Sequence, residues 1–217
     1  MPQATEKPRN APGDDRQTRI LDAAQHCFAN NGFHRTTMAD IALRAGMSAG
    51  NLYRYFESKD AVVAQLCGRD RAEIAGGFAQ INNAENPLEA FEALGRHHLV
   101  DEPRERAVLV AEIWSEAARN PGIARMCSDF DTDIKERLGA FMVQLKDRGL
   151  MQHSVDHTRL AELVTVLVDG VMLRRARDPA FDPAPFVQHI AELVLVAGAL
   201  PSLMQEQLPL QGQPLLQ

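Results

Sequence analysis

The segment that decides the fold is residues 16–60, RQTRILDAAQHCFANNGFHRTTMADIALRAGMSAGNLYRYFESKD. Within it, TTMADIALRAG (residues 36–46) predicts a short helix that ends at Gly46, since glycine adopts a left-handed backbone at little cost. MSAG (47–50) predicts a tight turn, and NLYRYF (51–56) predicts a second short helix. Two such helices joined by a tight turn form a helix-turn-helix, whose second helix is shaped to enter the major groove of DNA.

Capping residues and apolar spacing support this interpretation. Thr37, Ser48 and Ser58 each stand where a helix begins, and a hydroxyl there accepts a hydrogen bond from a free backbone N–H group. Leu52 and Phe56 are four residues apart and are expected to point into the core. The preceding helix is expected to bury the face formed by Met38, Ile41, Ala42 and Ala45.

The other side chains of this segment are candidates for DNA contact. Arg54 has the donor geometry that suits guanine, and Asn51 has the donor and acceptor pair that suits adenine. Base edges or the groove wall are also expected to meet the start of the second helix, at Ser48, Ala49 and Gly50. Phosphate contacts are expected from helix N-termini and from Thr37, Tyr53, Tyr55 and Lys59.

The same segment resembles the DNA-binding domain of the TetR family of transcriptional regulators. The resemblance rests on Phe28, Gly32 and Phe33 after an amphipathic helix, on Thr-Thr-Met-x-x-Ile-Ala, and on Leu-Tyr-x-Tyr-Phe-x-Ser-Lys. Two positions depart from the family: Ala49 stands where lysine is common, and Asn51 stands where threonine is common. The operator sequences of better-known members are therefore not carried over to this chain.

Composition and charge fit a DNA-binding head on an acidic body. The chain has 217 residues, 45% of them hydrophobic, and a net charge of −6. Residues 16–60 carry six Lys/Arg and four Asp/Glu, so this segment is mildly basic, and phosphate contacts act locally. No long apolar run predicts a membrane span or a signal peptide. The three widely spaced cysteines, with no disulfide or CxxC pattern, favour a reducing cytoplasm.

The whole chain is predicted to be all-α, with about nine helices and no strand. Residues 1–15 are predicted to be a disordered arm, 16–60 the helix-turn-helix domain, 61–200 a ligand-binding and dimerisation domain, and 201–217 a flexible tail. Helices are expected from residue 16 to 31 and from Lys59 onward, with a break at 82–87. Further helices are expected over 87–100, 104–120, 123–149, 156–177 and 183–200.

The last two helices are apolar nearly all round, which indicates burial on most faces. Packing against a second copy explains this better than the core of so small a body, and the resemblance implies a homodimer formed through the same two helices. Asp169 lies inside the apolar run and is either a ligand contact or a hydrogen-bonded structural acid. Arg174, Arg175 and Arg177 are predicted to form a solvated helix end.

The segment from Ala107 to Pro121 carries a second resemblance. Its Trp-x-Glu-Ala-x-x-Asn-Pro pattern is similar to the regulatory domain of the choline-responsive repressors of glycine-betaine synthesis. Trp114, with Glu112 and Glu116 nearby, either hosts a cationic ligand or serves as a core side chain. The effector is accordingly expected to be an amphipathic or cationic organic compound.

The family resemblance implies a ligand pocket inside the body. Its candidate lining residues are Phe91, Leu94, His98, Val110, Trp114, Met126, Phe130, Phe141 and Met172. His97 and His98 are adjacent, and because adjacent residues of an α-helix diverge by about 100°, they are not expected to share a metal. No metal site and no cofactor are predicted.

These features favour a homodimeric repressor that a small organic ligand releases from a palindromic operator in double-stranded DNA. The alternative is a regulator of the same fold that activates transcription or responds to no ligand. An enzyme is disfavoured, because the chain has no GxSxG, Walker or HExxH motif.

Overall fold

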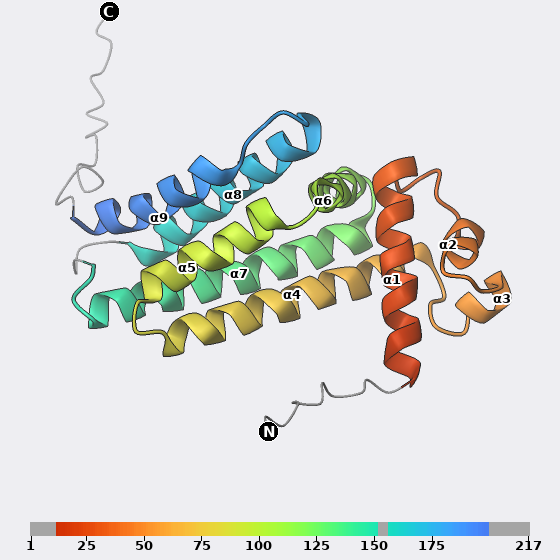
Figure 1. Ribbon diagram of the computed structural model, residues 1–217, viewed down its shortest axis with the longest axis horizontal. Helices are drawn as coiled ribbons and strands as arrows, with labels where there is room; N and C mark the ends of the chain where they lie inside the picture. Colours follow the sequence, from red (N-terminus) through yellow and green to blue (C-terminus); the bar gives the residue numbers. More distant parts are fainter. Residues whose placement is uncertain (1–11, 152–155, 200–217) are drawn as a thin grey trace, which may run out of the picture.

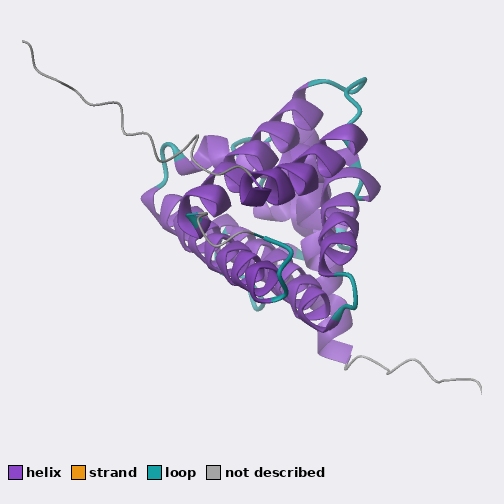
Figure 2. Ribbon diagram, turned by 90° about the vertical axis from the view of Figure 1, so that its left-hand side faces the viewer, coloured by secondary structure: helices purple, strands orange, loops and turns teal. Residues whose placement is uncertain are grey.

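The computed structural model describes residues 12–151 and 156–199, and every regular element in these ranges is a helix (Figures 1 and 2). The elements are α1 (Pro12–Asn31), α2 (Met38–Arg44), α3 (Ala49–Leu52), α4 (Lys59–Asn83), α5 (Pro87–Arg96), the π-helix η1 (His97–Asp101), α6 (Arg104–Ala117), α7 (Pro121–Asp147), α8 (His157–Arg177) and α9 (Ala184–Ala199). The predicted all-α fold is confirmed. Residues 1–11 of the predicted arm and the predicted tail lie outside the described ranges.

We call α1–α3 with their turns the head, and α4–α9 the body. In Figure 1, α1 stands across one end of the body, and α2 and α3 lie on its outer side. The head has a solid core, in which Ile20, Phe28, Ile41 and Leu52 are fully buried. Helix α1 begins at Pro12, one turn before the predicted start.

The predicted caps of the head are present. Thr37 Oγ1 accepts a hydrogen bond from the N–H of Asp40 at 3.2 Å, and the Asp40 carboxylate accepts one from the N–H of Thr37 at 2.8 Å. This reciprocal pair is a capping box, which fixes the start of α2. Ser48 and Ser58 cap α3 and α4 without a reciprocal bond: their hydroxyls accept from the N–H groups of Asn51 and Ala61. Gly46 has the left-handed φ of 71° that the predicted turn requires.

The second short helix differs from its prediction. It begins at Ala49, directly after its predicted cap Ser48, but it ends at Leu52, four residues before the predicted end at Phe56. The chain then stays hydrogen-bonded, because the N–H groups of Tyr55 and Phe56 both donate to the Leu52 carbonyl, at 2.9 and 3.0 Å. The last residues of the predicted helix are therefore turns that continue its surface.

The body is a bundle in which α4, α5, α7, α8 and α9 run along the long axis, while α6 crosses them (Figure 1). Seen end-on, these helices form a triangular outline (Figure 2). Helix α6 packs against α1 as well as against α7 and α8. Leu109 and Ile113 of α6 and Ile123 of α7 belong to the core of the head. Head and body are therefore joined by a continuous apolar contact.

The helix predicted over residues 87–100 is divided. Helix α5 ends at Arg96, and η1 continues with the wider turns of a π-helix. Arg175, predicted to be solvated, is only 8% exposed and donates to the carbonyls of Val100 and Glu102. Its guanidinium satisfies backbone carbonyls that the end of a helix leaves free, which corrects the prediction of a solvated helix end at this position.

Candidate DNA-binding surface and effector cavity

The outer surface of α3 and its following turn carries most of the predicted DNA contacts. Leu52 and Phe56 are buried, as their spacing predicts, and they hold the turn against the head. Tyr53 is 54% exposed and Tyr55 is 37% exposed. Arg54 is exposed, and its guanidinium makes no hydrogen bond or ion pair with any described residue. The exposed or half-buried remainder of this surface consists of Ser48, Ala49, Gly50 and Asn51.

Two residues that were predicted to contact phosphate, Thr37 and Lys59, have side chains that already bind partners in the head. The Thr37 hydroxyl donates to the Asp40 carboxylate at 2.7 Å. Lys59 Nζ donates to the Phe33 carbonyl at 2.6 Å and lies 4.3 Å from the centroid of the Phe33 ring. Lys59 thus fastens the start of α4 to the turn after α1. A phosphate contact of Lys59 stays a prediction, and it requires this cation to share or leave its present partners.

The head is attached to the body by polar contacts from one face of α6. The Glu112 carboxylate accepts a hydrogen bond from the N–H of Phe33 at 2.9 Å. Glu116, a buried acid, lies 2.8 Å from the Nε2 atom of His34. Of the two alternatives left open for Trp114, the one in which these two carboxylates join it around a cation is therefore wrong, because both carboxylates lie on the face of α6 that meets the head.

The body encloses an apolar cavity of about 210 Å³ between α4, α5, η1, α6, α7, α8 and α9. Six of the nine predicted lining residues border it, namely Phe91, Leu94, His98, Val110, Trp114 and Phe130. Trp114, for which two roles were open, is half-buried and lies in this wall. An apolar cavity with a few polar groups is the usual form of a small-molecule site.

Three predicted lining residues do not border the cavity, which corrects their assignment. Phe141 is fully buried behind the wall and stacks on Phe91, with ring centroids 4.7 Å apart. Met172 packs against the core of the body, and Met126 packs against the core that the head shares with α6 and α7. All three are apolar and lie on helices that border the cavity. The rotation of each helix about its own axis decides whether such a residue faces the core or the cavity.

Two carboxylates in the cavity wall have no hydrogen bond or ion pair with any described residue. They are Asp131 of α7, which sequence analysis missed, and Asp169 of α8. Burial, reinforced by the negative charge of Asp131, raises the pKa of Asp169 to about 6. Burial also raises the pKa of Asp131, against the opposing influence of Lys135. The sequence feature that could have indicated this acid is Phe130-Asp131, an aromatic and an acidic residue on one turn of α7 that both line the cavity.

A second polar corner of the wall contains Asp70 and His98. Asp70 forms an ion pair with Arg106, although burial still raises the pKa of Asp70. Burial lowers the pKa of His98. The rings of His97 and His98 lie 4.8 Å apart between centroids, which contradicts the expectation that these neighbours diverge. The two residues open the π-helix η1.

An exposed helix-turn-helix fastened to a helical body with an internal apolar cavity defines a DNA-binding transcriptional regulator. Family models agree with this class. Residues 20–66 match the model of bacterial regulatory proteins of the tetR family, and residues 87–196 match that of the C-terminal part of BetI-type transcriptional repressors. The chain belongs to the TetR family of transcriptional regulators, and both resemblances drawn from its sequence are confirmed.

Individual relatives are regulators too. The HTH-type transcriptional regulator UidR of Escherichia coli (strain K12) is 27% identical over 189 residues, which cover 82% of this chain and 90% of UidR. The structure of Salmonella enterica GusR is similar, with a TM-score of 0.74 and 26% identity, covering 88% of this chain and 98% of GusR. The fatty acid degradation regulator FadR from Bacillus halodurans shares the fold, with a TM-score of 0.75 and 20% identity, over 87% of this chain and 97% of FadR. Among the described helices, none has the length and apolar character needed to cross a membrane.

Proposed function

We propose that the chain is a homodimeric repressor, which binds a palindromic operator through α3 and is released when a small organic cation fills the body cavity. The observation that carries this proposal is the pair of unpaired carboxylates, Asp131 and Asp169, in an otherwise apolar cavity. Both carboxylates are half-buried in an apolar wall, and this partial burial raises the pKa of each, so a ligand that brings a positive charge would stabilise their ionised forms.

In the proposed complex, Arg54 contacts guanine and Asn51 contacts adenine. The Arg54 side chain is exposed, and its guanidinium has no partner among the described residues, so it is available for a bidentate contact. Tyr53 and Tyr55 are exposed beside it and suit phosphate contacts through their hydroxyl groups.

An exposed apolar stripe on α8 supports dimerisation. Val166 is 60% exposed and Leu173 is 54% exposed, and Leu163 and Leu167 lie on the same stripe. Gly170 lies between them with open space around its Cα atom, which allows close helix approach. Val196 of α9 is exposed as well. A two-fold axis through α8 and α9 would place two heads side by side, as a palindrome with half-sites about 34–36 Å apart requires.

The proposed effector has an apolar body and one cationic group. The cation lies near Asp131 and Asp169, and Trp114 and Phe130 supply aromatic faces that attract a cation. Filling the cavity displaces helices that line it, among them α4, which leads directly into the head, and α6, which is bonded to it. The separation of the two heads then no longer matches the two half-sites.

DNA binding is tested by fluorescence anisotropy of the purified full chain. The probe is a duplex from the intergenic region upstream of its own gene, compared with a scrambled duplex at near-physiological salt. The proposal predicts binding to the upstream duplex at least about 10³-fold tighter, with protection of two symmetric half-sites. Equal binding to both duplexes contradicts an operator in that region.

The cavity is tested through Trp114, the only tryptophan of the chain. Phenyltrimethylammonium and its uncharged isostere tert-butylbenzene have nearly the same shape, so their comparison isolates the charge. We expect the cation to change Trp114 fluorescence at about tenfold lower concentration, a difference of roughly 1.4 kcal/mol. Asp169→Asn should narrow this difference, whereas Glu162→Gln, an exposed acid on the same helix, should leave it unchanged. Equal affinity for the two compounds contradicts a cation site.

A further inference from the structure

We propose that Glu73, His97 and His98 form a binding site for a divalent transition metal, with zinc the best-suited ion. One ligand atom from each residue lies within 4.8 Å of the other two. His97 Nε2 is 2.8 Å from Glu73 Oε1, so two of the three ligands already meet. This site lies outside the operator surface and does not depend on the nature of the proposed effector.

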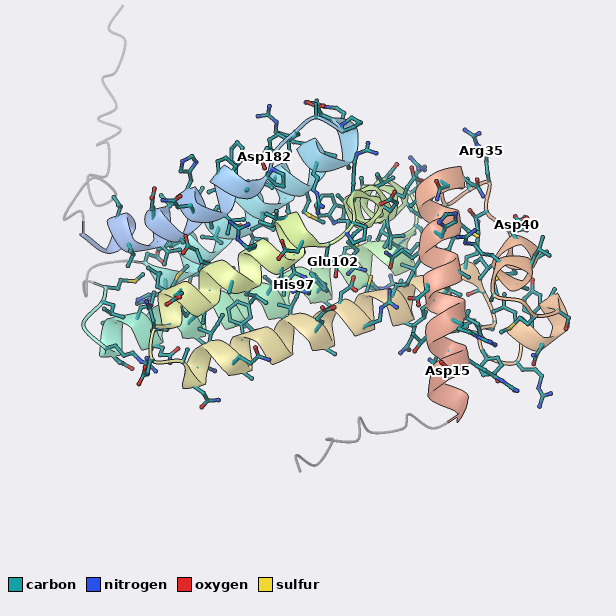
Figure 3. The ribbon with its side chains drawn as sticks, viewed as in Figure 1. Asp15, Arg35, Asp40, His97, Glu102 and Asp182 are labelled. Carbon is teal, nitrogen blue, oxygen red and sulfur yellow. The ribbon has the colours of Figure 1, made fainter. Side chains whose placement is uncertain are left out.

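The local backbone brings these side chains together. Glu73 lies in the middle of α4. The two histidines begin η1, which directly follows α5, and α5 packs against α4. Figure 3 shows His97 and Glu102 at this junction between α4 and the end of α5. Arg175 holds the far end of η1 through the carbonyls of Val100 and Glu102. The convergence of the histidines is thus fixed by contacts from two other helices.

The donor set suits zinc. Two imidazoles and one carboxylate form a set that zinc uses in open sites, where a fourth position remains for water or another ligand. Glu102 Oε1 lies 3.9 Å from His97 Nε2 and adds a negative charge at the rim. Arg106, whose positive charge acts on Glu73 and His98, forms an ion pair with Asp70.

His98 supplies an independent observation. Its Nε2 atom is buried and has no hydrogen-bond partner among the described residues, although buried polar atoms are nearly always bonded. A hydrogen bond between His97 and Glu73 explains those two residues as a surface pair, but it leaves His98 unexplained. Ligation of a metal through Nε2 would give this atom the polar partner that it lacks.

The site would connect two moving parts of the proposed regulator. His98 also lines the body cavity, and Glu73 belongs to the helix that leads to the head. A bound ion would therefore tie α4 to the end of α5 at the cavity wall.

The test is zinc binding by the tag-free full chain, stripped of metal and titrated against a chromophoric chelator of micromolar affinity. We expect one zinc ion per chain. His97→Ala and Glu73→Gln are expected to weaken binding at least about tenfold each, since even supporting residues of metal sites have effects of that size. His26→Ala removes an exposed histidine of α1 and should change nothing. Thermal unfolding without metal shows whether each variant folds.

Two results would overturn the proposal. One is failure of the wild-type chain to compete with the chelator. The other is unchanged zinc affinity in both the His97 and Glu73 variants, which would place the ion elsewhere, for example at Cys67 and Cys127. Neither result bears on operator binding or on the fluorescence comparison of the two cavity probes, so failure of this proposal is distinguishable from failure of the proposed function.

Discussion

The head and the cavity wall use similar apolar side chains but pack them differently. In the head, Phe28 and Ile41 are fully buried and the core is filled. In the body, Phe91 and Trp114 are only half-buried and border open space that also contains unpaired acids. A filled core resists deformation, whereas a cavity leaves room and charge for a ligand. We therefore expect the head to keep one conformation and the body to change its conformation when a ligand binds.

We expect the largest effect from a substitution that separates the two heads of the dimer. Val166→Glu places a charge in the exposed stripe of α8, and since Val166 is 60% exposed in the single chain, the fold should survive. We expect a monomer by light scattering and a loss of operator affinity of about 10²–10⁴-fold, because two linked heads bind cooperatively. Val143→Glu, a similar change on α7, should remain a dimer. A dimeric Val166 variant would place the interface elsewhere.

Phe91 and Phe141 are in contact, and substituting each of them tests the difference in packing between the cavity wall and the filled core. Phe141→Ala empties a filled position and should lower the free energy of unfolding by about 3–5 kcal/mol. Phe91→Ala enlarges a cavity that already exists, so we expect a clearly smaller loss together with altered binding of phenyltrimethylammonium. Chemical denaturation measures both. Equal losses would mean that Phe91 is as much a part of the core as Phe141.

The reading surface of the head is tested by Arg54→Ala. We expect a loss of about 1–3 kcal/mol on the operator and relaxed preference at one base pair, measured by anisotropy on a set of single-base variants. An equal loss on operator and scrambled duplex would assign Arg54 to phosphate instead.

Tyr53→Phe provides a milder comparison in the same turn. The change removes one hydroxyl and leaves the ring, so about 0.5–1.5 kcal/mol should be lost, to a similar extent on all sequences. A loss confined to one base of a half-site would contradict the phosphate contact.

The smallest effect concerns pH and the unpaired acids. Because the pKa of Asp169 is raised to about 6, the folded chain holds this proton more tightly than the unfolded chain does. Stability without ligand should therefore fall as pH rises from about 4 to 6, and Asp169→Asn should reduce that slope. Affinity for phenyltrimethylammonium should change in the opposite direction and increase through pH 6. Thermal unfolding and Trp114 fluorescence measure the two trends, and a flat profile in both would mean that Asp169 does not titrate in the cavity.

The sequence predicts the head better than the cavity, for physical reasons. The caps at Thr37 and Ser48 and the buried pair Leu52 and Phe56 depend on contacts within a few residues, so local spacing predicts them. The cavity wall depends on how seven elements are rotated against one another. Sequence spacing therefore could not separate Phe91 from Phe141, nor show that Glu112 faces the head. The close approach of the His97 and His98 rings was likewise indicated by no local pattern.

We propose that a cation in the body cavity weakens the binding of the head to DNA. The most direct measurement is displacement of the upstream duplex, followed by anisotropy, as phenyltrimethylammonium or tert-butylbenzene is added to the wild-type chain and to Asp169→Asn. We expect the cation to release the wild-type chain at about tenfold lower concentration than its isostere does, and we expect a much smaller difference in the variant. Equal release by both compounds, or no change in the variant, would contradict it.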